Sequence, residues 1–152
     1  MTIRNNRLIK TPWDIKKIKE TAIIISSCFS LLQKKIRAGI SSREINVYID
    51  NFIRRCGAFP SFPEIKNFPG AAAISINEEL VHGVPTDRIL QNGDLVSIDI
   101  GAKKNDYYAD AAVTFPVGEV SAEKKNLLKA GAEALQAGLK EMRPGCQINR
   151  AG

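Results

Sequence analysis

Two alternating segments on either side of a polar turn constrain the fold of this 152-residue chain more than any other feature. Residues 94–101 and 107–115 each alternate apolar side chains with polar or small ones, and residues 103–106 between them are polar. A period of two is typical of β-strands with one buried face, and a short polar connection joins antiparallel strands. The sequence therefore predicts a hairpin, whose core face carries Val96, Ile98, Ile100, Ala109, Ala111 and Val113.

Each predicted strand carries one aspartate on its other face. If the turn is centred between Lys104 and Asn105, Asp99 and Asp110 lie equally far from its centre and face each other directly. Directly opposed residues have Cβ atoms about 4.5–5.5 Å apart, so either one carboxyl group is protonated or a cation lies between the two. Hard oxygen ligands suit divalent Mn, Fe, Co, Zn or Mg. A register shifted by one residue would instead place one aspartate on the opposite face, and both alternatives stay open.

The single histidine of the chain, His82, lies in the segment Val81-His82-Gly83-Val84-Pro85. Taken alone, this segment favours a partly buried imidazole bonded to a backbone carbonyl. If His82 lies near the carboxylate pair, it could instead hydrogen-bond a substrate amide or carbonyl, and Gly83 would let a peptide backbone approach closely. Two aspartates cannot complete a catalytic metal site, which needs four or more ligands with one position open for water.

The rest of the chain predicts an α+β fold, an antiparallel sheet flanked by helices. Helix-start signals at Thr11-Pro12 and at the Ser41/Glu44 pair, with stops at Gly39 and Gly57, predict two helices before the strands, and Ser121 begins a third that ends at Pro144-Gly145. Residues 71–76 and 81–85 are predicted to be extended. Residues 58–70 form an apolar loop rich in Pro and Phe, which we expect to pack against another part of the protein or to line a pocket.

Composition predicts one cytoplasmic domain. The length suits a single domain at 11–152, preceded by a flexible basic lead at 1–10. Three dispersed cysteines suit reduced thiols, and neither a membrane span nor a secretory signal is recognisable. The net charge is +6, and one basic cluster could contact RNA, although a solvated face explains it more simply. That cluster consists of Arg4, Arg7, Lys10, Lys16, Lys17 and Lys19.

Several segments in order resemble the type I methionine aminopeptidases. They are His82-Gly83-Val84-Pro85, residues 92–99 (NGDLVSID) and residues 108–115 (YADAAVTF), with further similarity at residues 9–12, 75–78 and 144–145. The resemblance spans about residues 9–149. The wider creatinase and aminopeptidase P family shares the fold and the aspartates, whereas the His-Gly-Val-Pro element is similar to the methionine enzymes.

The resemblance implies the amino-terminal half of a pita-bread fold, which is built from two related halves. It implies a cytoplasmic metallo-exopeptidase that removes the initiator methionine from nascent polypeptides, with the ribosome as a candidate partner, and with two divalent ions (Co, Mn, Fe or Zn). Asp99 and Asp110 would be metal ligands, Asp110 bridging both ions, and His82 would bind substrate near the scissile bond. Phe59, Phe62 and residues 71–73 would lie near the pocket for the methionine side chain.

The same resemblance implies that part of the active site is missing from these 152 residues. The family's other ligands, one histidine and two glutamates, and a second substrate histidine belong to the other half of the fold. We therefore expect a truncated chain that is inactive alone, and we assign no catalytic residue. The alternative is a non-catalytic fragment that binds nascent peptide or ribosomal RNA. Half a fold would also leave an apolar sheet face uncovered, which favours self-association.

Overall fold

The structure is a computed structural model that describes residues 9–151, apart from the side chains of residues 65 and 66. Most of the expected basic lead, including Arg4 and Arg7, lies outside the described residues. The chain divides into two compact units after Gly118, and each is described by itself. None of the helices in the described part is both long and apolar enough to cross a membrane.

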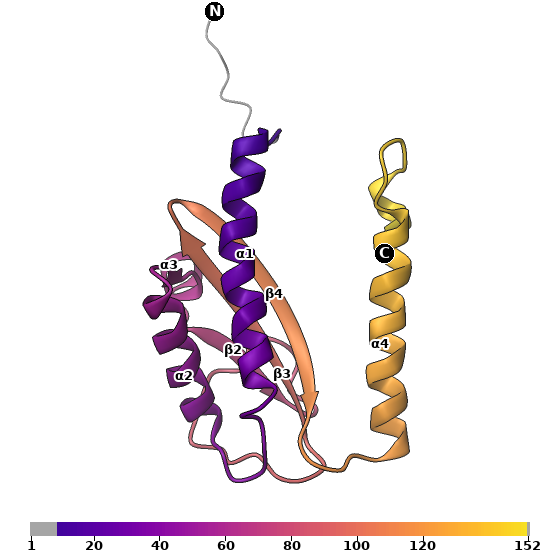
Figure 1. The fold of residues 1–152 in the computed structure, drawn as a ribbon. Coiled ribbons are helices and arrows are strands. Elements are labelled where there is room, and N and C mark those ends of the chain that lie inside the picture. Colours follow the sequence, from indigo (N-terminus) through magenta and orange to yellow (C-terminus); the bar gives the residue numbers. More distant parts are fainter. Residues whose placement is uncertain (1–8, 152) are drawn as a thin grey trace, which may run out of the picture. The chain divides into compact units, whose positions relative to one another are not determined.

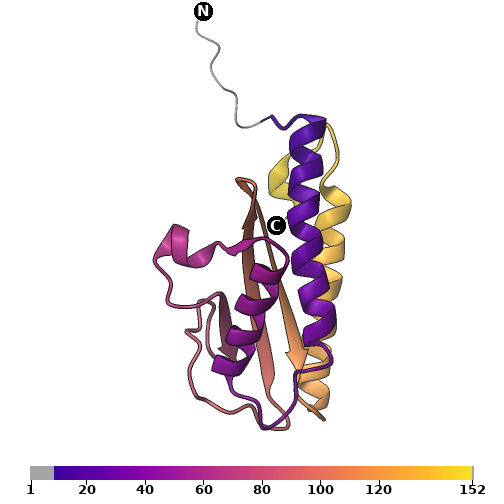
Figure 2. The same ribbon diagram turned by 60° about the vertical axis from the view of Figure 1, so that its left-hand side comes forward.

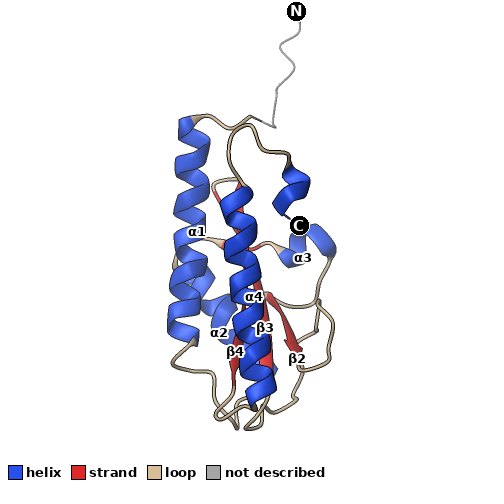
Figure 3. Cartoon of the chain, turned by 90° about the vertical axis from the view of Figure 1, so that its right-hand side faces the viewer, coloured by secondary structure: helices blue, strands red, loops and turns tan. Residues whose placement is uncertain are grey.

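The first unit, described over residues 9–118, contains an open antiparallel sheet of four strands (Figure 3). The strands are β1 (Phe59–Pro60), β2 (Ala72–Ile76), β3 (Leu95–Lys104) and β4 (Tyr107–Pro116). β3 is the central strand and pairs with β1, β2 and β4. The predicted α+β class with an antiparallel sheet is thereby confirmed.

Helices α1 (Pro12–Leu32) and α2 (Ser42–Arg55) cover one face of this sheet (Figures 1 and 2). α1 packs on β3 and β4, and α2 packs on β1 and β2. Both helices begin with a capping box, formed by Thr11 with Asp14 and by Ser41 with Glu44. These caps satisfy the first backbone N–H groups, which is why the start signals predicted the helices correctly. α1 ends at Leu32, earlier than the expected stop at Gly39.

The hydrophobic core lies between these helices and the sheet. It is built from buried side chains of α1, α2, β2 and β3, among them Ile25, Ile49, Ile74, Ile98 and Ile100. A short helix, α3 (Phe62–Lys66), interrupts the loop expected at residues 58–70.

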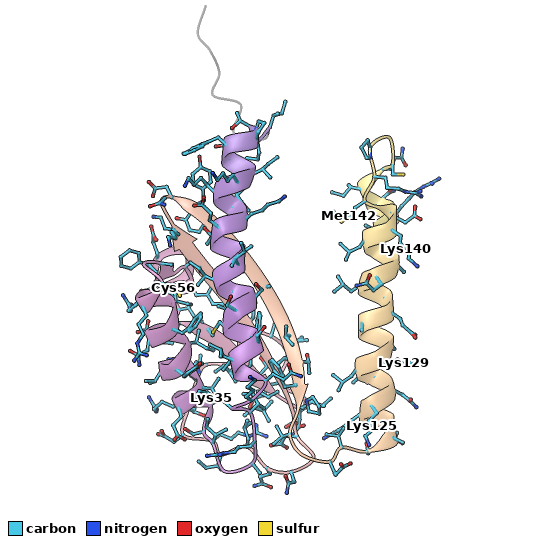
Figure 4. The ribbon with its side chains drawn as sticks, in the orientation of Figure 1. Lys35, Cys56, Lys125, Lys129, Lys140 and Met142 are labelled. Atoms are coloured by element: carbon cyan, nitrogen blue, oxygen red, sulfur yellow. The ribbon has the colours of Figure 1, made fainter. Side chains whose placement is uncertain are left out.

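The second unit consists of α4 (Ala122–Glu141) and a short 3₁₀ helix, Ile148–Ala151. Ser121 accepts a hydrogen bond from the backbone N–H of Lys124, so this predicted helix also starts where expected. No residue of α4 is buried, and Figure 4 labels Lys125, Lys129 and Lys140 along this helix. Leu127, Leu135, Leu139 and Met142 are all more than half exposed.

The predicted register of the β3–β4 hairpin is wrong. Asn105 and Asp106 form the turn, with φ of 51° and 63°, and Lys104 pairs with Tyr107. The turn centre therefore lies one residue later than expected, because Asn and Asp tolerate the left-handed conformation that tight hairpins require. Asp99 pairs with Ala112, and Asp110 pairs with Gly101, so the two aspartates are not directly opposed.

The predicted core face is confirmed on β3 and partly wrong on β4. Val96, Ile98 and Ile100 are buried, whereas Ala111 and Val113 are exposed. The alternation identified the side chains that share a face, but the covering of that face depends on α1, which packs on β4 and places Phe29 beside Phe115.

Candidate metal and substrate site

The candidate site lies on the sheet face opposite the core. Alternation along β3 turns Ser97, Asp99 and Gly101 to this face, because Ile98 and Ile100 point into the core. On β4, Asp110 and Thr114 share it. The hydroxyl groups of Ser97 and Thr114 lie 2.8 Å apart, which fixes the two strands with these side chains on one side.

Asp99 and Asp110 are diagonal neighbours on this face. Asp110 is displaced by two residues from Ala112, the partner of Asp99, so both carboxylates remain on the same side of the hairpin. The Cα atoms of such diagonal neighbours lie about 7–8 Å apart. At this separation two carboxylates are better placed to hold cations between them than to contact each other directly. Asp99 is half-buried and Asp110 is exposed. The Oδ1 atom of Asp99 is buried and accepts no hydrogen bond, while the residue as a whole makes other interactions.

A cavity of about 240 Å³ brings His82 and Asp99 together. Its walls come from β2, β3, β4 and the segment that follows β2, and Asp110 is not among them. The lining residues are Ala73, Ser75, Glu79, Leu80, Val81, His82, Ser97, Ile98, Asp99 and Ala112. His82 is exposed, which differs from the partly buried imidazole that its segment alone favours.

The residues expected around a methionine side chain lie in different places. Ala73 lines the cavity, whereas Ala71 and Ala72 belong to the hydrophobic core. Phe59 is 60% exposed and lies under the guanidinium of Arg54.

Gly101 and Phe62 form a close approach that the sequence did not predict. A Cβ atom at Gly101 would overlap the hydroxyl of Ser61 and the ring of Phe62. The missing side chain therefore lets α3 begin directly over the site face, beside Asp110. Lys103, two residues further along the same face, fixes α3 through Glu64 at 2.8 Å. The glycine following Ile100 was visible in the sequence, but the segment that would fill its space was not.

The carboxylates of the two aspartates are suitable ligands for a divalent ion, but two side chains are too few for a complete metal site. Carboxylate oxygens are ligands for hard and borderline cations, and the two share one surface. Among residues 9–151, no group of three or more His, Cys, Asp or Glu side chains is placed to hold a metal ion. The described residues thus supply part of a ligand set.

The basic cluster is partly neutralised within α1. Lys17 forms an ion pair with Glu20 at 2.8 Å and lies over the ring of Trp13. Lys16 and Lys19 are exposed. This arrangement resembles a solvated helix face.

Comparison with known proteins places this geometry in a family. The model of metallopeptidase family M24 matches residues 16–152. The chain is 44% identical over 142 residues to methionine aminopeptidase 1 of Bacillus subtilis, covering 93% of this chain and 57% of the relative. It is 40% identical over 140 residues to methionine aminopeptidase of Treponema pallidum, covering 92% of this chain and 54% of the relative. The chain therefore spans about half the length of the curated relatives it matches.

Solved structures show the same half-length similarity. Methionine aminopeptidase from Thermotoga maritima superposes with a TM-score of 0.87 at 32% identity, covering 90% of this chain and 55% of that one. Prolidase from Pyrococcus furiosus superposes with a TM-score of 0.85 at 26% identity, covering 95% of this chain and 42% of that one. These neighbours are pita-bread enzymes, and the chain has about half of that fold.

Proposed function

Because the chain belongs to metallopeptidase family M24, we propose that its site serves the hydrolytic removal of the initiator methionine from nascent polypeptides. The methionine aminopeptidase relatives, at 44% and 40% identity, support this reaction. One structural observation carries the proposal. Two carboxylates share the site face of the β3–β4 hairpin, and one of them lines a cavity with the single histidine.

In this proposal Asp99 and Asp110 hold two divalent ions (Co, Mn, Fe or Zn). The ions supply Lewis-acid polarisation and an activated water when bound. Asp99 would fix its ion against the cavity, since it is the half-buried carboxylate. Asp110, which is exposed, would contribute its carboxylate to holding both ions. His82 would donate or accept a hydrogen bond at the peptide near the scissile bond, within the cavity that it shares with Asp99.

We propose that these 152 residues do not turn over peptide alone. Metal-dependent hydrolysis needs four or more ligand positions, and the chain has one histidine and one pair of carboxylates on the site face. The purified, metal-loaded chain should release no methionine from a Met-Ala-Ser peptide. Measurable release would contradict the incomplete site.

Metal binding itself is tested with Mn²⁺, whose paramagnetism broadens nearby NMR signals. Broadening should concentrate on the site face of β3 and β4, and Asp99→Asn or Asp110→Asn should each weaken binding about tenfold or more, since each removes a charged ligand. Asp106→Asn is the matched control, because Asp106 lies in the turn of the same hairpin and is 92% exposed. Equal broadening in all three variants would overturn the proposed metal site.

A non-catalytic role in binding nascent peptide or ribosomal RNA is the second candidate. The exposed Lys16 and Lys19 of α1, together with a net charge of +6, favour it. Filter binding to RNA at several salt concentrations separates the two candidates. Affinity that falls steeply with salt supports phosphate contacts, and a flat response excludes them.

Self-association through the uncovered sheet face stays a prediction. On the core face of β4, the exposed apolar side chains are those of Ala111 and Val113, and so small a patch gives the prediction little support. Light scattering across a concentration series would measure the oligomeric state.

A further inference from the structure

The segment between β2 and β3 contains unusual backbone conformations next to the cavity. Val81 and His82 are consecutive left-handed residues, with φ of 35° and 52°. This region costs a non-glycine residue roughly 1 kcal/mol or more, and a β-branched valine adopts it rarely. Such a conformation persists only where surrounding contacts hold it. The backbone that presents His82 to the cavity must therefore be fixed by its neighbours.

Gly83, the next residue, is attached directly to β2. The backbone N–H of Ile74 donates to the Gly83 carbonyl at 2.8 Å, and the Gly83 N–H donates to Ser75 Oγ at 3.1 Å. A Cβ atom at Gly83 would overlap the Ile74 carbonyl, so the two backbones lie against each other. Ser75 is buried and lines the same cavity as His82.

We propose that Ser75 is a positioning residue that sets the orientation of His82. Ser75 Oγ accepts a hydrogen bond from the N–H of the peptide unit that joins His82 to Gly83. Because ψ of His82 sets the orientation of this peptide unit, the hydrogen bond fixes that angle and the direction in which the His82 side chain leaves the backbone. The inference rests on the proposed function in one respect, namely that His82 contacts the peptide substrate.

Other attachments of the segment act further from His82. The Oδ1 of Asn77 accepts from the N–H of Leu95, and Glu79 accepts from the N–H of Ile76 and from Arg88. These contacts hold residues 77–79, which precede the left-handed pair. Of the side chains named here, Ser75 is the one whose hydrogen bond reaches the peptide unit of His82 itself.

The cross-strand neighbour of Ser75 provides a matched control. Ser97 pairs with Ser75 in the β2–β3 register and lines the same cavity, but its hydroxyl is bonded to Thr114. Ser97→Ala therefore removes the same chemical group from the same cavity without touching the His82 peptide.

The experiment compares Ser75→Ala, Ser75→Thr and Ser97→Ala in the full chain. The His82 imidazole signals are unique in an NMR spectrum, since the chain has one histidine. In Ser75→Ala we expect shifted or multiple imidazole signals and hydrogen exchange of the Gly83 amide accelerated about tenfold or more. Ser75→Thr, which keeps the hydroxyl, should restore both, and Ser97→Ala should change neither.

Thermal unfolding of each variant separates local from global effects. Unchanged imidazole signals and Gly83 exchange in Ser75→Ala would overturn the inference, as would equal changes in Ser97→Ala. The readouts need neither metal nor substrate. If Mn²⁺ fails to bind while Ser75→Ala still disturbs His82, the proposed function fails and the positioning role of Ser75 stands.

Discussion

β3 and β4 have the same length and similar alternation, yet they occupy different environments. Each has ten residues and contributes one aspartate to the site face. β3 pairs with three strands and buries Ile100 completely, whereas β4 pairs with β3 and leaves Val113 37% exposed. Alternation therefore predicts which side chains share a face, but the burial of that face depends on the elements that cover it. The two carboxylates differ in the same way, since Asp99 is half-buried and Asp110 is exposed.

The largest expected effect on the free energy of unfolding comes from truncating a buried side chain of β3. Ile100→Ala should lower the free energy of unfolding by about 2–5 kcal/mol, because it leaves a cavity in a packed core. Val113→Ala, on the same face of the neighbouring strand, should lower it by less than about 1 kcal/mol. Urea unfolding of both variants measures the difference. Similar losses would mean that β4 is covered as well as β3.

The hairpin turn provides the next test. Asp106 has φ of 63°, so Asp106→Gly should raise the free energy of unfolding by about 0.5–1 kcal/mol, since glycine adopts this region without strain. The substitution also removes the ion pair between Lys103 and Asp106, whose atoms lie 3.4 Å apart. Because the Asp106 carboxylate is almost fully exposed, this ion pair contributes little to the free energy of unfolding. Asn105→Ala is the opposite control and should destabilise by about 1 kcal/mol. A destabilised Asp106→Gly would argue against the register observed here.

The same turn shows how far the sequence could predict the site. Alternation correctly predicted that Asp99 and Asp110 lie on the same face of the hairpin. Moving the turn centre by one residue changes the pairing partner of each residue by two positions, so both aspartates stay on that face. The direct pairing did not follow, because residues 103–106 offered more than one two-residue turn. The capping boxes at Thr11 and Ser41 were predictable because all their atoms are local in sequence.

Contacts between distant segments were beyond the sequence. The hydrogen bond from Gly83 to Ser75 joins residues that are eight positions apart, and nothing in their composition indicates that the chain returns to β2 there. The fit of Phe62 into the space above Gly101 has the same origin. Burial of β4 was also unpredictable, since it depends on where α1 lies.

The smallest expected effect concerns the attachment of β4 to α1. The Tyr107 hydroxyl, at the start of β4, donates to Asp14 in the capping box of α1. Hydrogen bonds from the Thr11 hydroxyl and from Tyr107 lower the pKa of Asp14 from its ordinary 3.8 to about 2. Because the pKa is lowered in the folded state, the resulting stability is present above pH 3.8 and is lost as the pH falls toward 2.

Tyr107→Phe should therefore make the urea midpoint less dependent on pH between about 4 and 2. The effect should be partial, since the Thr11 hydrogen bond, which lowers the pKa of Asp14 most, remains. Tyr108→Phe is the control, because the neighbouring ring lies beside Lys103 and not beside Asp14. Parallel pH curves for the two variants and the parent chain would show that the Tyr107–Asp14 hydrogen bond does not stabilise the attachment of β4 to α1. A flatter curve in Tyr107→Phe would instead identify a polar attachment of β4 that β3, buried at the centre of the sheet, does not need.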